Sequence, residues 1–162
     1  MSYQEKRTIT SLVAGVLLLG AYCIYAFGGN GPGAAGELNA WAVTMLVFIG
    51  IGVGVSIVLQ ILFHIAMSVS IAVREKGCDE KKIDKTIKAE MVEDERDKLI
   101  ELKSSKVGFA IVGTGFVAAL AVLALGGAAA LMLNIVFLAM GAGALLGGFI
   151  SLYYYRKGVK NA

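Results

Sequence analysis

Two long stretches of almost uncharged residues constrain the fold of this chain more than any other feature of its sequence. Residues 8–73 hold one charged side chain, Glu37, and residues 107–155 hold none. A helix of about 20 apolar residues, rising about 1.5 Å per residue, crosses the ~30 Å hydrocarbon layer of a bilayer. Each stretch is therefore long enough to cross a membrane twice, and the sequence predicts four transmembrane helices.

Composition points the same way. The 162 residues are 57% hydrophobic and only 17% charged, which lies far outside the range of soluble domains. The predicted fold class is therefore all-α, a polytopic membrane protein whose surroundings are the lipid bilayer.

The charged residues gather in one segment between the two stretches. Residues 74–106 contain ten of the fifteen Lys and Arg residues and ten of the twelve Asp and Glu residues. The other basic residues lie near the ends of the chain, and basic residues that flank membrane helices stay in the cytoplasm. The sequence thus predicts a multi-pass protein of the cytoplasmic (inner) membrane with both termini inside. Since the basic residues serve orientation and are matched by nearby acids, the net charge of +3 does not indicate nucleic-acid binding.

Three divisions of the chain follow from this pattern. Residues 1–73 are expected to form a first transmembrane hairpin, residues 74–106 a charged cytoplasmic helical segment, and residues 107–162 a second hairpin with a short basic tail. Both hairpins enter the membrane in the same orientation. The predicted membrane helices cover about residues 9–28, 39–73, 107–125 and 130–155.

The second predicted helix is too long for one crossing. From Asn39 to Lys76 it would measure roughly 57 Å, about twice what a bilayer requires. We expect its membrane part to end near His64 and the rest to extend inward.

Glycine-rich turns and aromatic residues mark the predicted outer side. Residues 28–33 and 126–127 are rich in glycine and favour turns. Tyr22, Tyr25 and Trp41 lie close to the first turn, and amphipathic rings prefer the headgroup region. The sequence therefore predicts that these three side chains lie at the outer membrane interface.

Polar residues recur every four positions along the second helix, at Ser56, Gln60, His64 and Ser68. Each step of four overshoots a full turn by about 40°, so these residues form a slowly winding stripe. One interpretation is the lining of a water-accessible groove with His64 as a titrating group. The other is that Gln60 and the hydroxyls bond across helices or to carbonyls one turn back, with His64 at the interface. Asn134 is expected to be a second buried amide, toward the outer side.

Small residues indicate where helices approach closely. Glycines in membrane helices allow close backbone contact and dispersion attraction between helices. The candidate packing face consists of Gly50, Gly54, Gly143 and Gly147. It fits either packing within one four-helix bundle or an interface between copies.

The most distinctive polar motif is Asp94, Glu95, Arg96 and Asp97, followed by an apolar pair and a membrane helix. On this motif and its four-span layout, the chain resembles a group of small prokaryotic membrane proteins of unknown function in which a similar motif precedes the third helix. The resemblance implies no activity. The motif itself fits either a charge network within one helix or a docking site for a cytosolic protein partner.

No constellation for catalysis, metal binding or cofactor binding occurs in the sequence. The predicted spans contain no Asp, Glu, Lys or Arg, which disfavours an ion-coupled transporter. The single histidine and two cysteines offer no haem or zinc spacing, and nucleophile elbows and phosphate loops are missing. Cys23 and Cys78 are expected on different sides of the hydrocarbon layer, where they cannot pair. The sequence predicts neither an enzyme nor a cofactor.

Two functions remain open at this stage. The first is a non-enzymatic homo-oligomeric membrane protein whose charged segment binds a second copy or a cytosolic partner. The alternative is a small channel or carrier for a weakly charged or apolar solute, lined by the polar stripe.

Overall fold

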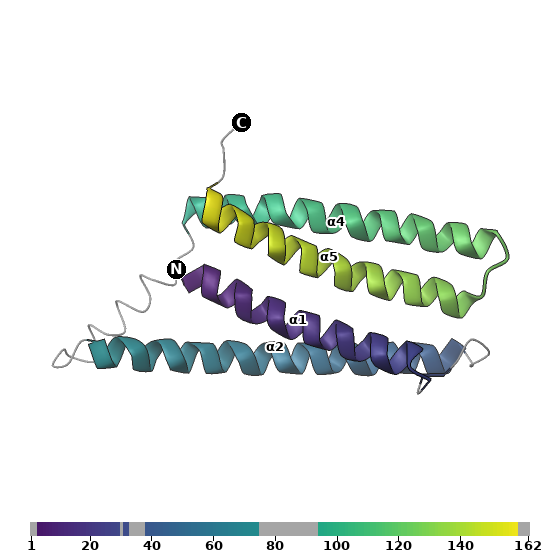
Figure 1. The fold of residues 1–162 in the computed structure, drawn as a ribbon, viewed down its shortest axis with the longest axis horizontal. Helices are drawn as coiled ribbons and strands as arrows, with labels where there is room; N and C mark the ends of the chain where they lie inside the picture. Colours follow the sequence, from purple (N-terminus) through teal and green to yellow (C-terminus); the bar gives the residue numbers. More distant parts are fainter. Residues whose placement is uncertain (1–2, 30, 33–37, 75–93, 159–162) are drawn as a thin grey trace.

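The computed structural model describes residues 3–29, 31–32, 38–74 and 94–158. They form four helices, and the described residues contain no strand (Figure 1). Each helix is long and apolar enough to cross a membrane. The prediction of an all-α protein with four candidate membrane spans is confirmed. The helices are α1 (Tyr3–Phe27), α2 (Leu38–Arg74), α4 (Glu95–Ala124) and α5 (Ala129–Lys157).

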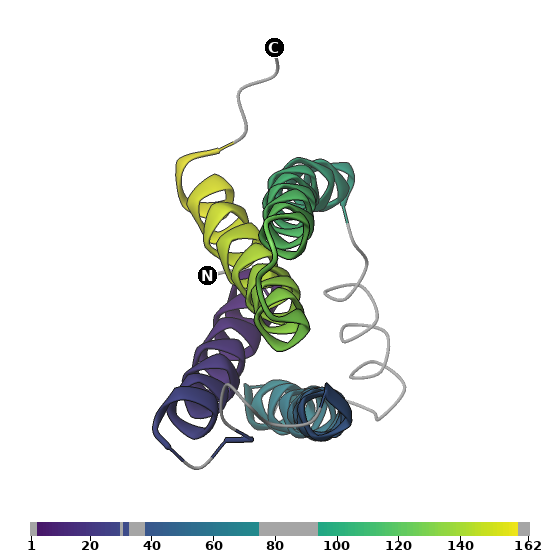
Figure 2. The same ribbon diagram turned by 90° about the vertical axis from the view of Figure 1, so that its right-hand side faces the viewer.

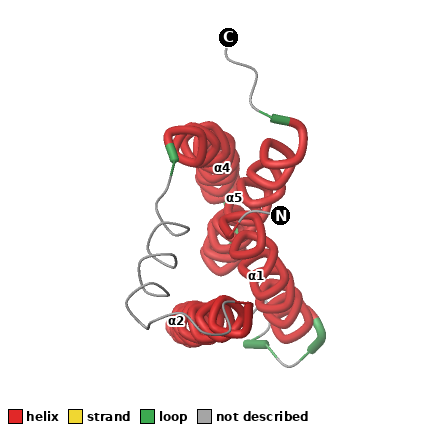
Figure 3. The backbone as a smooth tube through the Cα atoms, turned by 90° about the vertical axis from the view of Figure 1, so that its left-hand side faces the viewer, coloured by secondary structure: helices red, strands yellow, loops and turns green. Residues whose placement is uncertain are grey.

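The helices pack in the spatial order α4, α5, α1, α2, so that α5 and α1 occupy the middle (Figure 2). The interface between α4 and α5 is by far the most extensive, and α2 contacts α1 and, less, α5. Seen from the opposite end, α2 lies apart from α4 (Figure 3). As a result α2 is a peripheral helix. The most apolar stretch of 18 residues within Leu38–Ala66 contains no buried residue.

The two ends of the molecule differ in chemistry. The start of α1, the start of α4 and the end of α5 lie at one end (Figure 1), and they carry charged residues such as Glu5, Arg96 and Arg156. The opposite end holds the end of α1, the start of α2 and the turn between α4 and α5. This turn contains Gly126 with φ of +84°, a conformation that favours glycine. We call the end that holds the starts of α1 and α4 and the end of α5 the charged end.

Two helices begin earlier than predicted. α1 starts at Tyr3 and not near residue 9. α4 starts at Glu95 and runs without a break through the predicted start of the third membrane helix at residue 107. The last third of the charged segment is therefore continuous with the third candidate membrane helix, while residues 75–93 lie outside the described residues.

Helix α2 keeps its unusual length. Its 37 residues measure roughly 55 Å as a straight helix. Figure 1 shows that its C-terminal end extends past the other helices at the charged end.

Glycines permit the close approach of α4 and α5. A Cβ at Gly108 would stand 2.9 Å from the carbonyl oxygen of Gly143, and one at Gly143 would stand 2.8 Å from the carbonyl oxygen of Gly108. Two helical turns further along α4, a Cβ at Gly115 would collide with the side chain of Ala139. Backbone contact of this kind maximises dispersion between helices in lipid.

A hydrogen-bonded polar pair lies inside the apolar core toward the end opposite the charged end. Tyr22 is fully buried and Asn134 is 4% exposed, and the Tyr22 hydroxyl donates a 2.7 Å hydrogen bond to Asn134 Oδ1. Asn134 Nδ2 donates to the Ala130 carbonyl at 2.8 Å. The rings of Phe48 and Phe137 pack against Tyr22, with centroids 5.2 and 4.2 Å away. Asn134 is thus buried as predicted, with hydrogen-bond partners on α1 and α5.

Tyr22 and Trp41 are buried between helices and do not lie on the outer surface of the bundle. Both belong to the buried cluster, together with Ala26 and Met45. Tyr22 can be buried in the bundle because Asn134 satisfies its hydroxyl and aromatic rings pack against it. Tyr25, at 38% exposed, stays on the surface.

Candidate functional site

The structure divides the predicted polar stripe of α2 into two parts. Ser56 and Gln60 line a groove of about 530 Å³ between α1, α2 and α5, whereas His64 and Ser68 do not line it. Ser56 Oγ donates to the Gly52 carbonyl at 2.7 Å, and Ser68 Oγ donates to the His64 carbonyl at 2.9 Å. Both hydroxyls are therefore satisfied within α2, one turn back.

Gln60 has no such partner. Its side chain is exposed, and the structure gives it no hydrogen bond to another described residue. The same groove is lined by Gly15 of α1 and Leu145 of α5. Gly15 lies eight residues after Arg7, and Leu145 lies eleven residues before Arg156. These separations correspond to roughly 12 and 16 Å along the helices. Gln60 thus lines the groove within the candidate membrane span Leu38–Ala66, well away from the charged end.

The four candidate packing glycines also lie in different surroundings. Gly143 lies in the α4–α5 interface, and a Cβ at Gly147 would stand 3.4 Å from the Ser104 carbonyl oxygen. Gly50 and Gly54 face away from the described chain, with nothing within 4 Å of where a Cβ would stand. The glycine of α2 that does meet a neighbour is Gly52, where a Cβ would stand 2.7 Å from Leu18 Cδ2.

The Asp94–Asp97 motif starts α4. Asp94 is the N-cap, and its carboxylate accepts from the Glu95 amide at 2.7 Å. The Asp97 carboxylate accepts from the Asp94 amide at 3.2 Å, which completes a reciprocal capping box. The two acids satisfy backbone donors that a helix start leaves open and complement the positive end of its dipole.

Arg96 connects this helix start to the end of α5. Its Nη2 donates to the Tyr155 carbonyl oxygen at 3.3 Å, one of the carbonyls that the last turn of a helix leaves without a partner. The neighbouring Arg156 forms an ion pair with Glu5 of α1, with Nε and Oε1 3.5 Å apart. These contacts join α1, α4 and α5 at the charged end.

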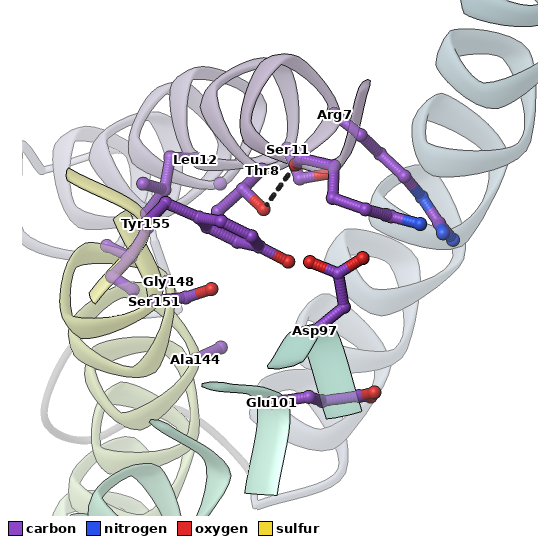
Figure 4. Close-up of a pocket in the computed structure, with 13 residues that line it drawn as sticks. Arg7, Thr8, Ser11, Leu12, Asp97, Glu101, Ala144, Gly148, Ser151 and Tyr155 are labelled. Atoms are coloured by element: carbon purple, nitrogen blue, oxygen red, sulfur yellow. Dashed lines mark hydrogen bonds between the residues drawn. The ribbon is translucent and has the colours of Figure 1, made fainter. Parts of the chain in front are cut away.

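A pocket of about 390 Å³ opens beside these contacts, between α1, α4 and α5. Figure 4 shows Arg7 coming from α1, Asp97 and Glu101 from α4, and Tyr155 from α5. The Tyr155 hydroxyl and the Asp97 carboxylate point toward one another. We call this the charged-end pocket, because both signs of charge line it.

No protein-family model, curated protein or solved structure matches this chain. What the chain does must therefore follow from its own residues and their placement. Among the described residues, no group of three or more His, Cys, Asp or Glu side chains could hold a metal ion.

The sequence singled out Asp97 but missed the side chains that meet it. Arg7, Glu101 and Tyr155 come from positions far apart in the chain, and each has an ordinary role at a helix end when viewed alone. The only local signal is that all three lie within two turns of a predicted helix terminus on the cytoplasmic side. Cys23, partly exposed, is a free thiol beside the buried cluster, and Cys78 lies outside the described residues.

Proposed function

We propose that this chain is a non-enzymatic multi-pass membrane protein that works as a homo-oligomer, with α2 at the interface between copies. One observation carries the proposal. The Gln60 amide lies in the candidate membrane span of α2 and has no hydrogen-bond partner among the described residues. The most apolar stretch of 18 residues in this span contains no buried residue.

An unpaired amide in hydrocarbon is unfavourable, because lipid offers it no hydrogen bonds. Amides of this kind promote association of membrane helices by bonding across the interface. Gly50 and Gly54 offer a further open face of the same helix. Their open positions would let a second α2 approach as closely as α4 approaches α5.

Charge supports an orientation for this assembly. Charged residues of α1, α4 and α5 share one end of the structure, and basic residues favour the cytoplasm. We propose that this end faces the cytoplasm in the inner membrane, where the exposed side chains of Glu95 and Lys98 are accessible to a second copy or a cytosolic partner.

The test measures energy transfer between differently labelled copies of the full chain in vesicles, at several protein-to-lipid ratios. Gln60→Leu is expected to weaken association about five- to thirtyfold, the effect of one interhelical hydrogen bond of about 1–2 kcal/mol in a membrane. Thr114→Val on α4 is the matched control, since the Thr114 hydroxyl is already bonded to the Ala110 carbonyl of its own helix. A wild-type chain that stays monomeric, or a Gln60→Leu chain that associates normally, would refute the proposal.

A second candidate function is favoured by the groove itself. Ser56 and Gln60 add polar atoms to an otherwise apolar path of about 530 Å³, which suits a small uncharged solute. In that case Gln60→Leu abolishes glycerol flux in vesicles while association is unchanged. His64→Ala leaves flux intact, because His64 does not line the groove.

A further inference from the structure

The charged-end pocket has the size and chemistry of a ligand site. Its volume of about 390 Å³ falls in the range of small-molecule pockets, which is about 300–1,000 Å³. It is lined by one guanidinium, from Arg7, and two carboxylates, from Asp97 and Glu101. Arg7 and Glu101 are exposed and make no ion pair with another described residue.

These three charged side chains determine which chemical groups a ligand of the pocket carries. Guanidinium binds phosphate through paired N–H donors, and carboxylates bind ammonium through charge-assisted hydrogen bonds. A ligand complementary to all three side chains therefore carries a phosphate and a primary ammonium together. A quaternary ammonium has the same charge but no N–H group to donate to Asp97 and Glu101.

The pocket continues into an apolar hollow. A second hollow, of about 460 Å³, follows the α4–α5 interface past Phe109, Val112 and Met140. The two share the lining residues Thr8, Ala144, Gly148 and Ser151. One path therefore leads from charged side chains at the membrane surface to apolar side chains within the membrane.

We propose that this path binds a glycerophospholipid with an ethanolamine headgroup. The phosphate faces Arg7, the ammonium faces Asp97 and Glu101, and one acyl chain lies in the α4–α5 hollow. The site is formed within a single copy of the chain, so it does not depend on self-association through α2.

The test is native mass spectrometry of the full chain with an equimolar mixture of phosphatidylethanolamine, phosphatidylcholine and phosphatidylglycerol that have identical acyl chains. The wild type is expected to retain phosphatidylethanolamine in preference to the other two. Glu101→Gln should reduce that preference by roughly tenfold, as expected for one charge-assisted hydrogen bond. Glu95→Gln, which removes an acid from α4 outside the pocket, should leave it unchanged.

A second variant tests the acyl-chain part. Ala144 lies where the hollows meet, so Ala144→Leu should lower retention of all three lipids several-fold without changing their ratio. Ala110→Leu adds the same volume to an exposed position of α4 and should have no effect. Equal retention of the three lipids by the wild type, or a preference that survives Glu101→Gln, overturns the proposal. Competition by soluble phosphoethanolamine at the same concentration as the lipid would show that the ligand is not a lipid.

Discussion

Removing one hydroxyl group from Tyr22 should measurably destabilise the packing of α1 against α5. In Tyr22→Phe the ring keeps its contacts with Phe48 and Phe137, so only the 2.7 Å bond to Asn134 Oδ1 is lost. The Asn134 oxygen then remains buried without that donor. An interhelical hydrogen bond in a membrane contributes about 0.6–2 kcal/mol, and an unsatisfied buried acceptor costs about 1–3 kcal/mol. We therefore expect a loss of about 1–2 kcal/mol, a five- to thirtyfold change in the folding equilibrium.

The assay is reversible unfolding in mixed detergent micelles, read out by circular dichroism. Tyr25→Phe is the matched control, because Tyr25 lies on the same helix but is partly exposed. The double variant Tyr22→Phe with Asn134→Leu completes a thermodynamic cycle and should show a coupling energy of about 1 kcal/mol, since the two side chains act as a pair. Equal stability of Tyr22→Phe and Tyr25→Phe, or a coupling energy of zero, would refute this account of the core.

Three further predictions concern helix contacts. Gly143→Ala should destabilise the α4–α5 pair by about 1–3 kcal/mol through overpacking, whereas Gly113→Ala on α4, where a Cβ would meet nothing within 4 Å, should be neutral or stabilise by up to ~1 kcal/mol; unfolding curves of the two variants compare them directly. Asp94→Ala should cost about 1 kcal/mol by removing the helix cap and speed hydrogen exchange in the first turn of α4, while Asp94→Asn should do neither. Arg96→Leu should speed exchange in the last turn of α5, where a carbonyl loses its donor, and Lys98→Leu should not; unchanged exchange in Arg96→Leu would contradict the contact.

The sequence was sufficient for the number and approximate position of the candidate spans, because these depend on hydrophobicity and length alone. It was not sufficient for helix rotation. Glycines alternate at positions 50, 52 and 54, and only contact with Leu18 of α1 determines that Gly52 faces inward. The exposure of a membrane helix face depends on its partner and not on its own pattern.

Long-range partners explain the other differences. The burial of Tyr22 depends on an amide 112 positions away, and Arg96 finds its acceptor 59 positions away. By contrast, the capping role of Asp94 and Asp97 is local, and their spacing of three residues is the signal for it. The motif was interpreted as a charge network or docking site because it was expected inside the charged helical segment of residues 74–106, whereas Asp94 caps the start of α4.

The account as a whole depends on the charged end and the glycine turns lying on opposite sides of one membrane. A chain with Cys23→Ala and Cys78→Ser, carrying either Ala128→Cys or Lys98→Cys, can be labelled with an impermeant maleimide in intact cells and in inverted vesicles. The predicted result is that position 128 reacts only from outside the cell and position 98 only from the cytoplasmic face. Reaction of both positions from the same side would contradict the account.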